Sequence, residues 1–429
     1  MGTKTSYNTP ADVFFAAAKS ATISIKSVSG NSKFWFRYEM VPGTDTFLDL
    51  PLSKTIPVGQ FPSNRLPTGS QSQLRLALPA TQAYSFVSPS NDKVVINTAT
   101  LDNINQVDEK MKKIYVYDGL DLNSPFVGTL YDYVTSPTLR TSSGNVTTIV
   151  NFYGTPTDSY ALANDFKSLS QYETYNFIVY SNNVTIPNNF QNGVSNAYTF
   201  YCTGSGRSYL TDLSFGKDGH KVDFRTLTPS DNVQFLLEYL ATGPFARSLP
   251  QMIPGKLFTM ITLGPELSFT LSTNGDNWLT PYNGRLGTVF SDSLWSPGAL
   301  PSYNYTFEST TVMKFTFNFH SVIVKKDGEQ ARVQVGQPGF QPASVTFNHT
   351  VTDPGVRVAN GTYLTASYIG DSPLSSSIIT FEMWNADGTT NAPASNTTAT
   401  TPSSMESTTK LGSTVNLIGA FVLLFVKFL

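Results

Sequence analysis

The sequence contains a single cysteine and only three histidines. One cysteine cannot form a disulfide within the chain, so no disulfide framework holds this protein. Cys202 is therefore a buried small hydrophobe, a free thiol, or half of a bridge whose partner lies outside this sequence. The separations between His220, His320 and His349 match no zinc motif. Cysteine and histidine thus give no indication of a metal site.

Charged side chains are scarce and nearly balanced, at 14% of the residues with a formal net charge of −2. Because there is no basic surplus, the composition gives no indication of nucleic-acid binding. Aromatic residues reach 13%, and Ser, Thr and Asn are abundant. A chain of this kind stays soluble through hydroxyls, amides or attached sugar, which favours an extracellular β protein over a cytosolic helical one.

Motifs for catalysis and for nucleotide binding are also missing. The segment TGSGRS at 203–208 has glycines but no nucleotide fingerprint, and the sequence has no Gly-X-Ser-X-Gly elbow. We therefore expect no enzymatic activity and no cofactor. A glycosidase-like pair of carboxylates stays open, because only folding brings such a pair together.

Six Asn-X-Ser/Thr sequons support an extracellular setting, although a few would arise by chance in a chain this rich in Asn, Ser and Thr. A glycan must point to solvent. The segment after Asn145 alternates, so we expect Val150 on an apolar strand face and Asn145 on the opposite face with Thr147 and Asn151, where a sugar could sit. The six candidate glycosylation sites are Asn145, Asn183, Asn304, Asn348, Asn360 and Asn396.

The last part of the sequence changes from polar to strongly apolar. Residues 391–410 are rich in Thr, Ser and Pro, as expected of a solvated, O-glycosylated stalk. The apolar run from Leu417 to Val426 is too short to span a bilayer, which needs roughly 20 residues. Small residues, a polar spacer and a terminal apolar tail are typical of a glycosylphosphatidylinositol (GPI) attachment signal. We expect residues 411–429 to be this signal or, alternatively, a hydrophobic tail anchor or an interfacial segment.

Ser407 is the first candidate for lipid attachment, because Ser407, Thr408 and Thr409 are all small. Ser403 is the alternative, weakened by Met405 two positions later. A lipid anchor requires entry into the secretory pathway, yet the start of the sequence has no signal peptide. We therefore expect the sequence to lack the true N-terminus of the protein.

Short segments of alternating polarity, bounded by Gly, Pro, Asn and Asp, recur along the chain. Met313, Phe315, Phe317 and Phe319, for example, alternate with polar residues. The segment VQFLLEYL at 233–240 fits either a helix or a strand, and a strand agrees better with the repeats below. We predict an all-β fold without a long helix.

Parts of the sequence resemble one another. Residues 21–43 and 222–244 both predict a strand, a polar turn and a second strand, and residues 364–384 are a looser third copy. Tyr282-Asn283-Gly284 similarly echoes Tyr117-Asp118-Gly119, and a Gly-Thr pair follows each. These repeats indicate tandem β modules.

The segment IYVYDGLDLNSPFVGTL, followed by SSGNVTTIVNFYG, resembles the CUB domain, in which a strand leads into Tyr-Asp-Gly, a loop, a Gly-Thr-Leu turn and another strand. The specific match covers residues 68–155, with a weaker echo at 255–320. Low cysteine content, a Ser/Thr stalk and a hydrophobic tail make the chain similar to the nematode CUB-like proteins. This resemblance implies tandem jelly-roll β-sandwiches, secretion or surface anchoring, no catalysis, and a role in innate defence or stress response.

Some CUB domains bind calcium through acidic and amide oxygens near one end of the sandwich. The corresponding candidates are Asp118, Asp121, Asp132 and Asp158, but their spacing matches no strict calcium loop. The second copy has Asn283 where the first has Asp118, and Asp-Gly or Asn-Gly is sufficiently explained by a turn. We therefore favour a turn role for Asp118 and expect no bound metal.

The expected division of the chain follows the repeats. The expected segments are a remnant of a truncated β module (1–42), a CUB-like domain (43–160), a second β domain (161–242), a CUB-like repeat (243–321), a final β domain (322–390), the stalk (391–410) and the anchor signal (411–429).

We predict a non-enzymatic binding or adhesion protein, held by a GPI anchor on the extracellular face of the plasma membrane and associated with innate immune defence or stress response. Its expected partners are an extracellular ligand, with a glycan or a microbial surface as candidates, and the membrane, but no nucleic acid. Trp278 and Trp295 could stack on sugar, although burial in the core is the simpler interpretation. The alternatives are a structural coat glycoprotein without a discrete ligand and an unrecognised hydrolase.

Overall fold

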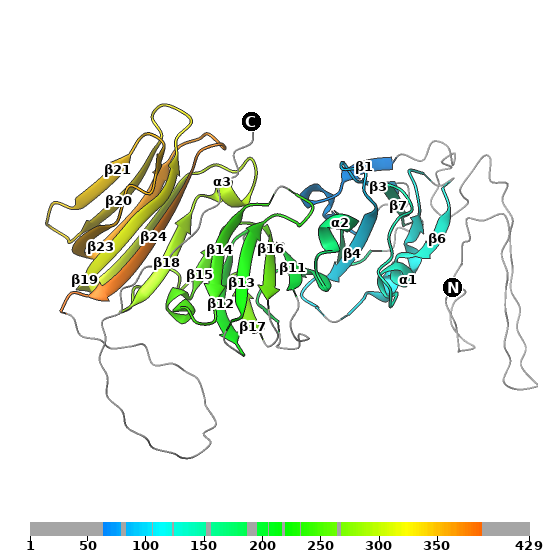
Figure 1. Ribbon diagram of the computed structural model, residues 1–429, viewed down its shortest axis with the longest axis horizontal. Helices are drawn as coiled ribbons and strands as arrows, with labels where there is room; N and C mark the ends of the chain where they lie inside the picture. Colours follow the sequence, from blue (N-terminus) through cyan, green and yellow to red (C-terminus); the bar gives the residue numbers. More distant parts are fainter. Residues whose placement is uncertain are drawn as a thin grey trace, which may run out of the picture. The chain divides into compact units, whose positions relative to one another are not determined.

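The computed structural model describes residues 63–387, except 79–82, 105, 122–123, 152–155, 187–194, 205, 217–218, 232 and 264–266. The described part consists of β-strands and helical turns of three to five residues, so the prediction of an all-β fold of tandem β-sandwiches is confirmed (Figure 1). No helix of this part is both long and apolar enough to cross a membrane. The predicted N-terminal remnant, stalk and anchor signal, with Asn396, Ser403 and Ser407, lie outside the described residues.

The first sandwich packs a five-stranded sheet, in the order β1-β3-β7-β5-β6, on a three-stranded sheet, in the order β2-β8-β4. Phe86 on β3 and Ile149 on β7 meet Ala163 on β8 in a fully buried core. Burying a side chain such as Phe86 contributes roughly 1.5–3 kcal/mol. The elements are β1 (Ser63–Pro67), η2 (Ser70–Ser72), β2 (Leu74–Arg75), β3 (Ala83–Val87), β4 (Val94–Thr100), η3 (Glu109–Lys113), β5 (Tyr115–Tyr117), β6 (Phe126–Thr129), α1 (Leu130–Val134), β7 (Val146–Val150), β8 (Ser159–Asp165) and α2 (Phe166–Leu169).

The expected exposed face of β7 is wrong. Thr147 and Asn151, predicted to share a solvent face with Asn145, are at most 1% exposed, and Ile149 between them enters the core. The opposite face is covered too, because the Thr148 hydroxyl donates to the Gly119 carbonyl oxygen at 2.7 Å. Pairing with β3 and β5 satisfies both edges of β7, and other parts of the chain cover both of its faces, so alternation alone could not identify the core side.

The second sandwich packs a four-stranded sheet, in the order β10-β17-β12-β15, on a five-stranded sheet, in the order β14-β13-β16-β11-β9. Phe200, Phe258 and Phe269 meet in its core. Residues 233–240 contain a strand, and the predicted strand–turn–strand at 222–244 is the β13–β14 hairpin. The elements are β9 (Thr174–Tyr180), β10 (Val184–Ile186), β11 (Ser195–Cys202), β12 (Ser208–Phe215), β13 (Lys221–Thr226), β14 (Phe235–Leu240), η4 (Phe245–Ser248), β15 (Gln251–Ile253), β16 (Leu257–Leu263) and β17 (Leu267–Ser272).

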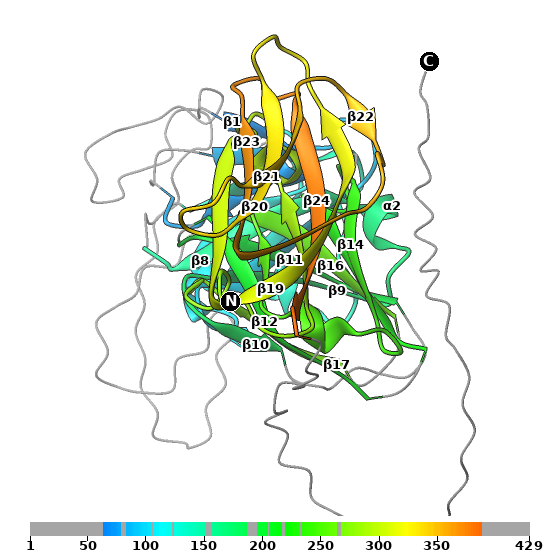
Figure 2. The ribbon, with the colours of Figure 1, turned by 90° about the vertical axis from the view of Figure 1, so that its left-hand side faces the viewer.

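The third sandwich is a seven-stranded sheet in the order β18-β24-β19-β23-β20-β21, with β22 paired to β19 (yellow-green to orange in Figure 2). The predicted alternation in β19 is confirmed, since Met313, Phe315, Phe317 and Phe319 are all buried in its core. The elements are β18 (Arg285–Phe290), α3 (Asp292–Trp295), β19 (Tyr303–Ile323), β20 (Gln330–Gly336), β21 (Ala343–Phe347), β22 (Val351–Thr352), β23 (Arg357–Ile369) and β24 (Ser376–Asn385).

This sheet becomes two layers because β19 bends sharply. Its register against β23 shifts between Glu308 and Met313. At one end of β19 the Tyr303 hydroxyl lies 2.8 Å from the Ser377 hydroxyl, and Ser377 pairs with Val322 at the other end. The two ends of a 21-residue strand therefore lie together, with the core between its halves.

The sheets do not follow all of the expected segment boundaries. The boundary after residue 160 falls within β8 and the one after residue 321 within β19. The boundary after residue 242 separates β13 from β16, which are paired neighbours. In the looser copy at 364–384, β23 and β24 are separated by β19 instead of forming a hairpin. Repeats in sequence reflect local strand–turn–strand patterns, whereas a sandwich is delimited by pairing between distant strands.

Candidate functional site

A cavity of about 240 Å³ lies in the first sandwich, where the ends of β5 and β7 meet α1. Its lining mixes one carboxylate, one guanidinium, three hydroxyl groups of Ser or Thr, one phenol and one apolar side chain. Tyr133, Ser142 and Thr147 are buried, whereas Val127 and Arg140 are exposed at its rim. The lining residues are Asp118, Val127, Tyr133, Arg140, Thr141, Ser142 and Thr147.

Strand pairing brings Asp118 to Thr147. Tyr117, the last residue of β5, is the register partner of Thr148, so Asp118 just after β5 and Thr147 on β7 lie opposite each other, and both line the cavity. The carboxylate of Asp118 accepts the backbone N–H of Ser143, with its two oxygens 2.9 and 3.0 Å from the nitrogen. This contact fixes the segment before β7. The carboxylate can still accept hydrogen bonds from further donors, because it has about four acceptor positions.

Tyr133 is placed by the short helix α1. Thr129 caps this helix, accepting from the backbone N–H of Asp132 and donating its hydroxyl to the Asp132 carboxylate at 2.7 Å. Burial raises the pKa of Tyr133, and the nearby Asp118 charge raises it further while Arg140 opposes this. The phenol therefore stays protonated at neutral pH and is a neutral hydrogen-bonding group, not a base.

Two buried hydroxyl groups at this cavity are unpaired. The Tyr133 and Thr147 hydroxyls have no hydrogen-bond partner among the described residues, and these residues are 5% and 1% exposed. Leaving a buried polar group unpaired costs about 1–3 kcal/mol. Ser142 differs, because its hydroxyl donates to the Gly144 carbonyl oxygen at 2.6 Å and accepts from the Val94 N–H at 2.7 Å.

Among the described residues, the guanidinium of Arg140 makes one weak hydrogen bond. Its guanidinium lies 3.4 Å from the Val127 carbonyl oxygen. Arg140 and Asp118 line the same cavity, yet among the described ion pairs none joins them. The cavity therefore offers a donor and an acceptor of opposite charge that remain available to a small ligand. With one carboxylate in its lining, it does not have the pair that glycoside hydrolysis uses.

The structure does not bring the four candidate calcium ligands together. The Asp132 carboxylate accepts from the hydroxyl of Thr129, the N-cap of α1, and the Asp121 carboxylate lies 3.3 Å from the Ser124 hydroxyl in a surface turn. Asp158 pairs with Arg75 at 3.1 Å, with both side chains largely exposed. Within the described ranges no group of three or more His, Cys, Asp or Glu side chains could hold a metal ion. Asp118 thus holds the segment before β7 through the Ser143 N–H and lines the cavity.

The remaining candidate residues occupy both the cores and the surface of the described part. Cys202 is buried and unpaired, and Trp278 and Trp295 are core residues at 2% and 0% exposure. Asn145 is half-buried before β7. The exposed sequon residues in the described part are Asn183, Asn304, Asn348 and Asn360.

Sequence reasoning identified Asp118 but missed Tyr133, Arg140 and Thr147. Tyr133 and Thr147 lie in ordinary apolar and strand patterns, and Arg140 lies in a polar loop. No local signal marks them. They become a site only because α1 and the segment before β7 fold against the end of β5.

Comparisons with known proteins give no family. No protein-family model matches the sequence, and no curated protein matches it. Among solved structures, the chain is similar to the CUB1-EGF-CUB2 domains of rat MASP-1, at 10% identity over 48% of this chain and 99% of that chain, with a TM-score of 0.17. The corresponding region of human MASP-1/3 gives 11% identity, 47% and 99% coverage, and a TM-score of 0.18. An archaeal virus protein with a triple jelly-roll fold gives 10% identity, 75% and 96% coverage, and a TM-score of 0.14.

These likenesses are too low to assign a family or a function.

Proposed function

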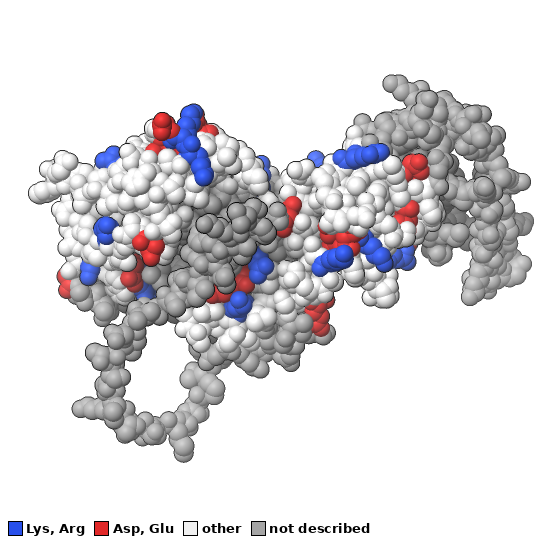
Figure 3. Space-filling model, turned by 45° about the horizontal axis from the view of Figure 1, so that its top comes forward, with Lys and Arg blue, Asp and Glu red and all other residues white. Residues whose placement is uncertain are grey.

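We propose that this chain is a non-enzymatic extracellular binding or adhesion protein and that its first sandwich recognises a small ligand. The observation that carries the proposal is the polar cavity, in which two buried hydroxyls lack partners next to a carboxylate and a guanidinium. Concave sites with a few convergent polar groups are the usual form of a ligand site. On the face shown in Figure 3, most of the surface belongs to residues other than Lys, Arg, Asp and Glu.

The proposed location is the outer face of the plasma membrane, with a GPI anchor attached at Ser407 or Ser403. The apolar tail and the Ser/Thr-rich segment before it support this proposal. A role in innate defence or stress response is the setting that the CUB-like resemblance implies. Release of the full chain from membranes by phosphatidylinositol-specific phospholipase C is the expected result. Resistance, with Leu417 to Leu429 retained in the mature protein, would defeat the anchor.

Binding is tested with the full chain on a glycan array and on bacterial cells. We expect saturable binding that weakens when the cavity is changed by Asp118→Asn together with Tyr133→Phe. The matched control is Tyr117→Phe, which removes a buried, unpaired hydroxyl outside the cavity lining. Equal binding by all three proteins would show that the cavity has no part in recognition.

A structural coat glycoprotein is the second candidate, favoured by the four exposed sequon residues in the described part. Glycans at these positions would cover much of the surface and add solubility to a chain with few charges. The two candidates differ in one result. A coat protein carries the sugars but binds neither the array nor the cells.

A further inference from the structure

The cavity of the first sandwich has polar groups that are not satisfied by the protein. The hydroxyls of Tyr133 and Thr147 are unpaired within the described residues and at least nine-tenths buried. Each hydroxyl can donate one hydrogen bond and accept others. A partner that both donates and accepts therefore satisfies them best.

The carboxylate of Asp118 and the guanidinium of Arg140 limit the charge that a ligand of this cavity can carry. A cation would be attracted to Asp118 but repelled by Arg140, and an anion would meet the opposite problem. A metal ion is disfavoured also because Asp118 is the one carboxylate in the lining. A ligand whose hydroxyls donate to Asp118 and accept from Arg140 meets neither repulsion.

A zwitterion could pair with both charged groups, and it is the rival ligand included in the experiment below. Its ammonium group only donates and its carboxylate only accepts, so each could meet a hydroxyl in one role, whereas each unpaired hydroxyl can both donate and accept. Hydroxyl groups on adjacent carbons of a ring present donors and acceptors side by side.

The dimensions agree with a single ring. The volume of about 240 Å³ is below the range of roughly 300–1,000 Å³ that is typical of sites for drug-sized ligands. Among the lining residues Tyr133 and Thr147 are buried, whereas Val127 and Arg140 are exposed. A ring could therefore enter with one end free to continue into solvent as part of a longer chain.

We infer that this cavity binds a single uncharged sugar residue, such as the terminal hexose of a glycan, through the carboxylate of Asp118, the guanidinium of Arg140 and the hydroxyls of Tyr133 and Thr147. The inference rests on the proposed binding function and specifies its ligand. The ring hydroxyls bridge Asp118 and Arg140, and they give Tyr133 and Thr147 the partners that the protein does not supply.

The experiment uses the full chain and free small ligands. Saturation-transfer NMR and calorimetric titration are carried out with the methyl glycosides of mannose, galactose, glucose and N-acetylglucosamine. Alanine, inorganic phosphate and calcium chloride are the zwitterionic, anionic and cationic comparisons. We expect at least one glycoside to bind, and alanine, phosphate and calcium not to compete with it.

Two isosteric variants test the buried hydroxyls of Tyr133 and Thr147. Tyr133→Phe and Thr147→Val each remove one hydroxyl, and we expect each to weaken glycoside binding about 3- to 10-fold, since one neutral hydrogen bond is lost. Tyr117→Phe and Thr262→Val remove buried, unpaired hydroxyls that do not line the cavity, and binding should be unchanged. Thermal unfolding of all four variants checks that the fold is retained.

The outcomes separate the inference from the function on which it rests. Binding of alanine or phosphate that depends on Tyr133 and Thr147, with no glycoside bound, would overturn the sugar but keep the binding function. If nothing in the panel binds, and Tyr133→Phe and Thr147→Val match their controls on the array and on cells, the hydroxyls are satisfied by water and both proposals fail.

Discussion

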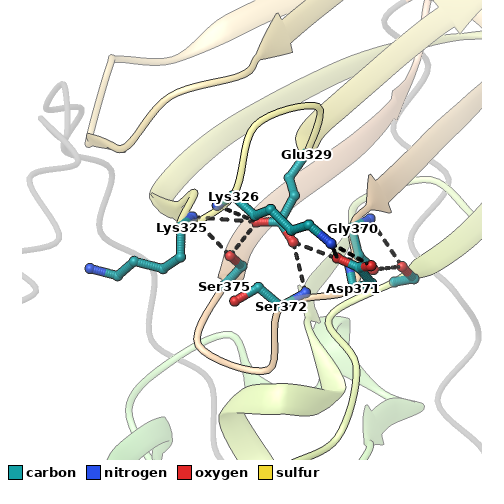
Figure 4. Close-up of polar contacts among 8 residues, drawn as sticks. Lys325, Lys326, Glu329, Gly370, Asp371, Ser372 and Ser375 are labelled. Atoms are coloured by element: carbon teal, nitrogen blue, oxygen red, sulfur yellow. Dashed lines mark hydrogen bonds and ion pairs between the residues drawn. The ribbon is translucent and has the colours of Figure 1, made fainter.

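Oε1 of Glu329 accepts a hydrogen bond of 2.8 Å from the backbone N–H of Ser372. This bond joins the loop between β19 and β20 to the loop between β23 and β24 (Figure 4). The same carboxylate holds further groups of both loops, although Glu329 is only 2% exposed. The other donors are the backbone N–H groups of Lys325, Lys326 and Asp371 and the hydroxyl of Ser375.

The third sandwich should lose stability in acid. Burial of Glu329 opposes its charge, but hydrogen bonds from the Ser375 hydroxyl and from backbone N–H groups outweigh burial and hold the pKa of Glu329 below its usual value. A lowered pKa stabilises the folded state above the usual glutamate pKa of about 4.3, and this contribution is lost as the pH falls through the lowered value. Urea unfolding at pH 7 and at pH 3.5, followed by tryptophan fluorescence, should show a lower midpoint in acid.

Glu329→Gln should remove much of this contribution. The amide keeps one oxygen but places an NH₂ group against N–H donors, so we expect a loss of about 2–4 kcal/mol at pH 7. The matched control is Asp371→Asn, whose side chain is 65% exposed in its pair with Lys326 and should cost less than about 1 kcal/mol. An equal acid sensitivity in Glu329→Gln and wild type would contradict the assignment.

Arg285 should tolerate no substitution, including lysine. Its guanidinium is fully buried, donates to the carbonyl oxygens of Thr280 and Trp278, and lies 5.4 Å from the Phe307 ring centre. Burial lowers its pKa to about 10, so it remains charged at neutral pH. Lysine cannot reproduce the planar fork, and we expect Arg285→Lys to cost roughly 2–4 kcal/mol in chemical denaturation. Arg357→Lys, at an exposed position, should stay within about 0.5 kcal/mol.

Gly361 should be required where β23 follows the bend of β19. A Cβ at this position would lie 2.5 Å from the carbonyl oxygen of Gly336 on β20, and backbone cannot move aside cheaply. We expect Gly361→Ala to lower the free energy of unfolding by roughly 2–3 kcal/mol. Gly144→Ala is the control, because its Cβ would meet nothing within 4 Å. Similar midpoints for the two variants in urea would refute a steric requirement.

Cys202 should report the unfolding of the second sandwich. Its side chain is fully buried, so a thiol reagent should react slowly with the native chain and completely in urea. Rapid labelling under native conditions would show that the core around β11 opens. Cys202→Ser should cost about 1–3 kcal/mol, because it buries a hydroxyl in place of a thiol whose sulfur lies 4.0 Å from the Arg207 carbonyl oxygen.

The alternation of Met313 to Phe319 placed these side chains in the core before any pairing was known, because one face of that strand is covered and the other is not. The same argument failed for β7, since both of its faces are covered, which buries Thr148 on one face and Ile149 on the other. Segment boundaries failed for a related reason. Which strands pair is decided by contacts distant in sequence.

The amino-acid sequence by itself determined the β class, the local turns and the Asp-Gly position at the end of β5, because side-chain alternation and turn chemistry act over a few residues. Tertiary structure alone decided that Asp118 meets Tyr133, Arg140 and Thr147 in one cavity. These residues come from β7, α1 and two loops, and the pairing of β5 with β7 brings them together. Tertiary structure likewise separated the four aspartates, whose nearness in sequence suggested a shared site.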